Sequence, residues 1–137
     1  MAIYLDTSVL VSAFVEDDHS DAVAAFLADA PDVIISRWAE AEFSSALGVR
    51  CRARTLDDGQ KREAETIFDG WQSGQTRLRV DDHDLILCRR LIREGGQLRT
   101  PDALHLALVV RHGHALATLD QQLARAARSS GVMVIDL

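Results

Sequence analysis

The sequence predicts an α/β protein in which helices cover both faces of a mainly parallel β-sheet, giving a three-layer α/β/α sandwich. Short β-branched apolar runs alternate along the chain with longer segments of helical period. Helix-capping and helix-ending residues stand at the boundaries between these segments. The length of 137 residues matches one domain, so we expect residues 1–137 to form a single domain.

The first half of the chain predicts two strands separated and followed by helices. Asp6-Thr7-Ser8 follows the first apolar run and suits the start of a helix. Pro31 and Asp32 should end the second helix, and Ser36 should cap the third. The expected elements are a strand over 3–5, helices over 9–14 and 20–28, a strand over 33–35 and a helix from 37 to about 49.

The second half of the chain continues the alternation, and its clearest local signal is Thr100-Pro101-Asp102. There a Thr cap precedes a proline at the first helical position and a carboxylate in the first turn. Gly113 suits a left-handed cap at the end of that helix. The expected elements are helices over 57–71, 82–93, 100–112 and 120–128, strands over 78–80, 115–118 and 132–135, and helix stops at Gly74, Gly95-Gly96 and Gly131. The apolar stripe expected on the helix over 82–93 consists of Leu85, Cys88, Leu91 and Ile92.

Composition restricts the function classes. The net charge of −6 argues against non-specific coating of nucleic acid, which depends on Lys and Arg neutralising phosphates. The two cysteines form no CxxC pair, and no apolar stretch approaches the roughly 20 residues of a membrane span. We therefore expect a soluble cytoplasmic protein with no membrane partner.

Four carboxylates are expected to meet where ligands bind in open α/β sheets, outside the carboxyl ends of the strands. Asp6 and Asp120 follow strands, Glu42 lies on the helix after the second strand, and Asp102 lies at a helix start. Such a cluster repels itself unless protons or a cation compensate, and Mg²⁺ or Mn²⁺ prefers oxygen ligands. For any one of these acids a helix cap or a solvated position is the more common role, so spacing alone leaves both roles open.

Two questions remain about residues near this cluster: which of two glutamates faces the site, and what role a nearby histidine has. Glu40 and Glu42 point about 200° apart on a helix, so only one can face the site; we expect Glu42 to do so and Glu40 to be solvated. His105 lies one helical turn after Asp102. It either orients a carboxylate or a phosphate, or is a packed histidine bonded to the backbone, which is the more common case.

The ordered set of motifs resembles the PIN-domain ribonucleases, and more narrowly the VapC toxins of type II toxin–antitoxin modules. The matching segments are Asp6-Thr7-Ser8, Glu42 to Leu47 (EFSSAL), Thr100 to Ala107 (TPDALHLA), Leu116 to Asp120 (LATLD) and Val132 to Asp136 (VMVID). The resemblance implies an acidic quartet of Asp6, Glu42, Asp102 and Asp120 that holds Mg²⁺ or Mn²⁺ and cuts structured or single-stranded RNA with a metal-activated water. It also implies supporting contacts from Thr7, Ser8 and Thr118.

The same resemblance implies partners. These are an RNA substrate, a cognate VapB-like antitoxin, and a second copy of the chain in a homodimer or a larger toxin–antitoxin assembly. Two alternatives stay open: an RNA-processing nuclease of this fold outside a toxin–antitoxin pair, and a non-catalytic module that binds RNA or protein. The only lysine, Lys61, falls in a predicted polar helix, which disfavours a phospho-receiver, and no P-loop or dinucleotide motif is present.

Overall fold

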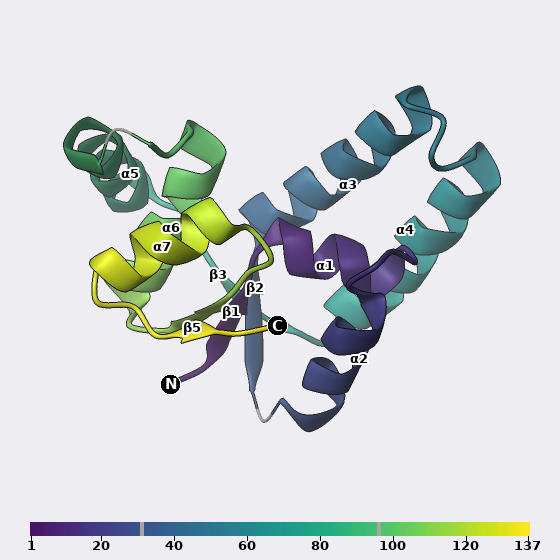
Figure 1. The fold of residues 1–137 in the computed structure, drawn as a ribbon, viewed down its shortest axis with the longest axis horizontal. Coiled ribbons are helices and arrows are strands. Elements are labelled where there is room, and N and C mark those ends of the chain that lie inside the picture. Colours follow the sequence, from purple (N-terminus) through teal and green to yellow (C-terminus); the bar gives the residue numbers. More distant parts are fainter. Residues whose placement is uncertain (31, 96) are drawn as a thin grey trace.

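A computed structural model describes residues 1–30, 32–95 and 97–137 of the chain (Figure 1). Five parallel strands form one sheet in the order β3-β2-β1-β4-β5. The elements in chain order are β1 (Ile3–Leu5), α1 (Thr7–Phe14), α2 (Ser20–Asp29), β2 (Val33–Ser36), α3 (Arg37–Arg52), α4 (Asp58–Gln72), β3 (Thr76–Leu78), α5 (Asp82–Gly95), α6 (Thr100–His112), β4 (Ala115–Ala117), α7 (Gln121–Ser129) and β5 (Val134–Ile135).

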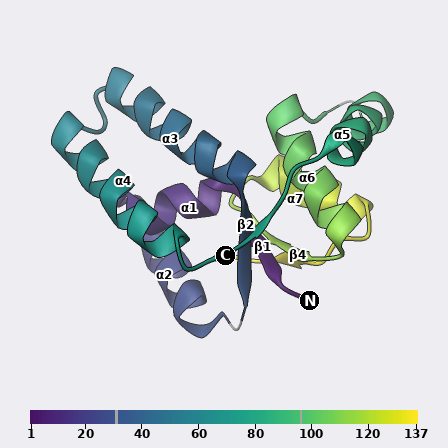
Figure 2. The same ribbon diagram turned by 180° about the vertical axis from the view of Figure 1, so that it is seen from behind.

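Helices lie on both sides of the sheet, which confirms the predicted three-layer fold. Helices α1 to α4 lie on one side, and α5 to α7 lie on the other (Figures 1 and 2). Side chains alternate between the two faces of a strand, so consecutive residues of β1 pack into the hydrophobic clusters on opposite sides of the sheet. Leu5 belongs to the cluster under α1 and α3, whereas Tyr4 belongs to the cluster under α6 and α7.

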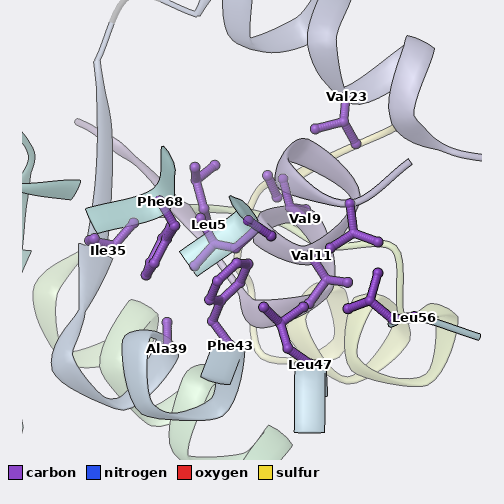
Figure 3. Close-up of a cluster of buried hydrophobic side chains, with 14 residues drawn as sticks. Leu5, Val9, Val11, Val23, Ile35, Ala39, Phe43, Leu47, Leu56 and Phe68 are labelled. Atoms are coloured by element: carbon purple, nitrogen blue, oxygen red, sulfur yellow. The ribbon is translucent and has the colours of Figure 1, made fainter. Parts of the chain in front are cut away.

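The larger core cluster joins β1 and β2 to the first four helices (Figure 3). Its centre is aromatic: the rings of Phe43 and Phe68 stack with centroids 4.1 Å apart, and Phe14 meets both rings at a steep angle. These contacts fasten α3 to α4 and both helices to α1. The helix that carries Glu42 is therefore fixed against the sheet by its buried face.

Local capping agrees well with the sequence. Asp6, Ser36 and Asp120 each accept a backbone N–H of the following helix through the side chain. Gly113 adopts the left-handed conformation, with φ of 68°, at the end of α6. Asp6, Ser36 and Asp120 lie at the strand ends beside the candidate site. The residues that begin these helices therefore also lie next to the candidate functional side chains.

Several predicted boundaries are wrong by one or more residues. Strand β3 spans Thr76–Leu78 rather than 78–80, because its parallel pairing sets Leu78 opposite Ser36. Strand β5 covers only Val134–Ile135 of the expected 132–135. The N-cap of α6 is Arg99, which puts Thr100 inside the helix. Strands β3 and β5 both lie at edges of the sheet, where a strand has only one neighbouring strand and the apolar pattern of its sequence is weaker.

The predicted apolar stripe of α5 is also partly wrong. Leu85 is 50% exposed, whereas Asp84 is fully buried and binds Arg111 of α6. The helical period predicted that Leu85 faces the core, but the buried position is occupied by Asp84, which pairs with Arg111 of the neighbouring helix. Helix α5 continues through Gly95, and the expected breaks at Pro31 and Gly96 lie outside the described residues. Within the described parts of the chain, no helix has the length and apolar character needed to cross a membrane.

Candidate active site at the carboxyl edge of the sheet

The four predicted acids lie at the carboxyl ends of adjacent strands or at helix starts beside them. Asp6 follows β1 and caps α1, and Asp120 follows β4 and caps α7. Glu42 lies in the second turn of α3, directly after β2. Asp102 lies in the first turn of α6. Since β2, β1 and β4 are neighbours in the sheet, the fold brings these segments to one edge.

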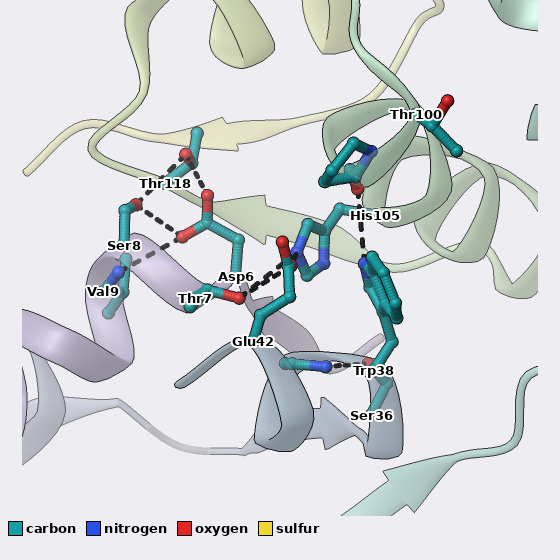
Figure 4. A network of polar contacts seen from close by, with 12 residues as sticks. Asp6, Thr7, Ser8, Val9, Ser36, Trp38, Glu42, Thr100, His105 and Thr118 are labelled. Carbon is teal, nitrogen blue, oxygen red and sulfur yellow. Dashed lines mark hydrogen bonds and ion pairs between the residues drawn. The ribbon is translucent and has the colours of Figure 1, made fainter. Parts of the chain in front are cut away.

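Asp6 is buried and held by three donors (Figure 4). Its Oδ1 accepts the Ser8 hydroxyl at 2.6 Å and the Val9 N–H at 3.2 Å, and its Oδ2 accepts the Thr118 hydroxyl at 2.5 Å. Burial raises the pKa of the Asp6 carboxyl above its ordinary value, while these hydrogen bonds favour the ionised form. Three of the roughly four lone-pair positions of the carboxylate are therefore occupied.

Glu42 is held through one of its two oxygens. Its Oε1 accepts the Thr7 hydroxyl at 2.9 Å and makes a short contact with Nε2 of His105. The side chain of Glu42 is 23% exposed, whereas that of His105 is 2% exposed. Thr7 stands between Asp6 and Ser8 in the sequence, so consecutive residues at the end of β1 hold two different carboxylates.

Asp102 and Asp120 complete the acidic edge. Burial, and next the negative charge of Asp120, raise the pKa of the Asp102 carboxyl; Glu42 and Asp6 act in the same direction. The Asp120 carboxylate caps α7, and its backbone N–H donates to the Thr118 hydroxyl at 3.0 Å. Thr118 thereby links Asp6 to the start of α7, and Asp102 lies within electrostatic reach of the other three acids.

Glu40 and Glu42 have separate roles, as their helical spacing predicts, but Glu40 is not solvated as expected. Its side chain is only 14% exposed and pairs with Arg37 at 2.7 Å and with Arg77 of β3 at 2.5 Å. Glu40 therefore connects α3 to the sheet edge, while Glu42 bonds to Thr7 and His105. The predicted choice of Glu42 agrees with this arrangement.

Among the described residues, the ring nitrogens of His105 bond to side chains and not to the backbone partner that is more common for a packed histidine. Its Nδ1 lies 2.7 Å from the Tyr4 hydroxyl, which in turn lies 2.7 Å from the Ser36 hydroxyl. Sequence reasoning missed Tyr4 and Ser36 as members of the site. The available signal was the single hydroxyl-bearing side chain inside the apolar run Ile3-Tyr4-Leu5, because a buried phenol usually finds a partner.

The donor chemistry of the site fits a hard dication. The four candidate ligands are all carboxylates, which Mg²⁺ and Mn²⁺ prefer, and the raised pKa of Asp102 reflects burial and negative charge that a cation would offset. As the side chains stand, no three His, Cys, Asp or Glu residues of the described ranges are gathered in an arrangement that could hold a metal ion. Asp6 and Glu42 are instead held by hydroxyl and imidazole groups.

Comparison with known proteins identifies the family. The model of the PIN domain matches residues 3–129, so the chain belongs to the PIN-domain family. Within that family it is similar to ribonuclease VapC46 of Mycobacterium tuberculosis, with 34% identity over 98% of this chain and 96% of the relative. VapC nucleases of this family generally depend on divalent metal ions.

Solved structures share the fold at lower identity. VapC20 of Mycobacterium tuberculosis, described as a toxin that cleaves the sarcin–ricin loop, has a TM-score of 0.72 and 18% identity, covering 91% of this chain and 95% of that one. VapBC2 of Rickettsia felis, solved bound to a DNA fragment from its promoter, has a TM-score of 0.71 and 14% identity, covering 100% and 99%. Both confirm the PIN-like fold predicted for this chain.

Proposed function

We propose that this protein is the endoribonuclease toxin of a VapBC-type toxin–antitoxin pair and that Asp6, Glu42, Asp102 and Asp120 form its active site. The assignment is supported by the position of these four acids along the carboxyl edge of the sheet, in a chain of the PIN-domain family. A non-catalytic module of the same fold would be expected to have lost such carboxylates, since a buried charge such as Asp6 is costly to keep.

The four acids are the proposed ligands of Mg²⁺ or Mn²⁺. A divalent ion at the site would supply Lewis-acid stabilisation of the charge that develops when an RNA phosphodiester is cut. Ser8 and Thr118 hold Asp6, and Thr7 and His105 hold Glu42, so two carboxylates are oriented before any ligand arrives. This ordering reduces the reorganisation needed during the reaction.

The proposed partners follow from the relatives and from charge. A structural neighbour from Klebsiella pneumoniae was solved as a toxin–antitoxin complex, and the acidic edge of this chain suits a basic side chain of a similar antitoxin. We also propose a homodimer of this chain, alone or within a larger complex with the antitoxin, and action in the cytoplasm, where the RNA substrate lies. Co-purification from a two-gene expression system and the mass of the complex test these partners.

The test of activity replaces Asp6 and Asp102, the two acids of the site whose carboxyl pKa is raised, with asparagine of the same shape. Asp6→Asn and Asp102→Asn are each expected to lower the RNA cleavage rate in Mg²⁺ or Mn²⁺ by at least about 100-fold, because an amide cannot replace a carboxylate ligand. Purified wild type and variants are incubated with total RNA, and circular dichroism and melting temperature confirm folding. Sequencing of RNA 5′ ends after induction in cells then identifies the target.

Asp69→Asn is the matched control, because Asp69 is an exposed acid of α4. This variant should cleave at the wild-type rate. Full cleavage by folded Asp6→Asn or Asp102→Asn would contradict the assignment of the active site, and no cleavage by the wild type on any RNA would contradict the function.

A further inference from the structure

A buried chain of polar side chains runs behind Glu42. The Ser36, Tyr4 and His105 side chains are 0%, 0% and 2% exposed. Ser36 Oγ lies 2.7 Å from Tyr4 Oη, and Tyr4 Oη lies 2.7 Å from His105 Nδ1. The other ring nitrogen of His105, Nε2, contacts Glu42 Oε1. These side chains come from β2, β1, α6 and α3, so only the folded protein brings them together.

The direction of each hydrogen bond follows from counting donors and acceptors. Ser36 Oγ accepts the N–H of Ala39 at 3.1 Å as the cap of α3. In the described parts of the chain, the only other partner of this hydroxyl is Tyr4 Oη, so Ser36 must donate its proton to Tyr4. The Tyr4 hydroxyl then has its own proton for one remaining neighbour, His105 Nδ1.

This count leaves one form of the imidazole. Nδ1 accepts from Tyr4 and therefore carries no proton, so the ring proton is on Nε2. Nε2 lies against Glu42 Oε1 and, at 3.3 Å, near the Thr7 hydroxyl, which itself donates to Glu42; the ring proton is therefore donated to Glu42. A ring that donates from Nδ1 to Tyr4 would leave one of the two buried hydroxyl protons, that of Ser36 or that of Tyr4, without an acceptor.

We propose that Ser36, Tyr4 and His105 form a directional relay that fixes His105 in its Nε2–H tautomer and makes it a positioning residue for Glu42. Thr7 and His105 both bind Oε1 of Glu42, so the relay leaves Oε2 as the oxygen that serves the reaction. The functional part rests on the ribonuclease activity proposed above. The tautomer itself does not.

The path of the relay explains why it positions Glu42 instead of only filling space. Both of its ends lie on α3, since Ser36 caps this helix and Glu42 lies in its second turn. Between them the relay passes through β1 and α6. The start of α3 and the Glu42 side chain are thereby fixed to β1, which Asp6 directly follows, and to α6, which carries Asp102. These contacts set the relative positions of the three acids.

Nuclear magnetic resonance tests the tautomer in the full-length protein without RNA or metal. Two-bond ¹H–¹⁵N correlations of labelled histidine rings distinguish the Nε2–H, Nδ1–H and doubly protonated forms. The His105 signals are assigned by their loss in His105→Gln. We expect the Nε2–H form at neutral pH in the wild type and loss of its dominance in Tyr4→Phe, which removes the donor to Nδ1. A dominant Nδ1–H or doubly protonated ring in the wild type would overturn the relay.

Kinetics tests the positioning role with a conservative and a non-conservative variant. His105→Leu removes the donor to Glu42 and should lower kcat by about 10–100-fold with little change in KM, because His105 is buried and acts through Glu42. His105→Gln keeps an amide N–H near the position of Nε2 and should recover part of the loss. Equal losses in the two variants, both folded, would overturn the positioning role.

His83→Gln is the control for both measurements. His83 is an exposed histidine of α5, with 78% of its side chain accessible, and this substitution should leave the cleavage rate and the His105 ring signals unchanged. An inactive wild type with the Nε2–H ring would refute the proposed function while leaving the relay intact, so the two failures are distinguishable.

Discussion

At the scale of single residues, the site depends on hydroxyl groups that satisfy buried carboxylates. Thr118 donates to Asp6 Oδ2 at 2.5 Å and accepts the N–H of Asp120 at 3.0 Å. A hydrogen bond to a charged group contributes more than one between neutral groups, and leaving a buried carboxylate without its donor costs more still. Thr118 should therefore matter for stability as well as for the position of Asp6.

Thr118→Val tests this contribution with a side chain of the same shape. We expect the free energy of unfolding to fall by about 2 kcal/mol, since the Asp6 carboxylate loses a buried donor. Urea unfolding monitored by circular dichroism measures the change. Thr66→Val is the control, because Thr66 is exposed and donates to the Arg62 carbonyl within α4; its effect should stay within about 0.5 kcal/mol. Equal effects of the two substitutions would contradict the role of Thr118.

At the scale of elements, helix ends decide where the functional side chains stand. Asp6 and Asp120 cap the helices that follow β1 and β4, and Ser36 caps the helix that carries Glu42. The end of α6 is set by Gly113, whose φ of 68° disfavours any side chain even though nothing lies within 4 Å of an added Cβ. This glycine allows the chain to turn from α6 directly into β4.

Two glycine substitutions separate backbone conformation from packing. Gly113→Ala should lower the free energy of unfolding by about 1 kcal/mol, because alanine is strained at positive φ. Gly70→Ala should raise it by roughly 0.5–1 kcal/mol, because Gly70 lies inside α4 with open space around an added Cβ. Thermal or urea unfolding of both variants checks the opposite signs. A stabilising Gly113→Ala would contradict the left-handed cap.

At the scale of the whole molecule, the acidic edge links stability to pH and to cations. Burial raises the pKa of Asp6 and of Asp102 above their unfolded values. The stabilising contribution of such a carboxyl is fully present below its unfolded pKa and is lost as the pH rises through its folded pKa. The metal-free protein therefore bears a cost at neutral pH that a bound dication should offset.

Mn²⁺ should accordingly raise the melting temperature, and more at about pH 7.5 than at about pH 5, where the carboxyls are closer to protonation. At about 100 times the dissociation constant, the gain is about 2.7 kcal/mol. Differential scanning fluorimetry with and without Mn²⁺ measures the shift. Asp102→Asn should lose most of it, whereas Asp69→Asn should keep it. Equal shifts in both variants would place the ion elsewhere.

The sequence by itself determined most of the local structure. Apolar alternation and capping residues predicted the order of strands and helices, because periodicity and backbone capping are properties of a few neighbouring residues. The same reasoning predicted that Asp6, Glu42, Asp102 and Asp120 lie at one edge of a parallel sheet, since each follows a strand or lies in the first two turns of a helix. Their role as metal ligands stays a prediction.

Tertiary packing decided the remaining features. The register of β3, the burial of Asp84 in place of Leu85 and the pairing of Glu40 with Arg77 depend on elements that meet only in the folded protein. In the relay, Tyr4 bonds to Ser36, which is 32 positions away in the sequence, and to His105, which is 101 positions away. A hydrogen bond depends on distance and direction to within a fraction of an ångström, and a pattern of residue types does not set such geometry between distant segments.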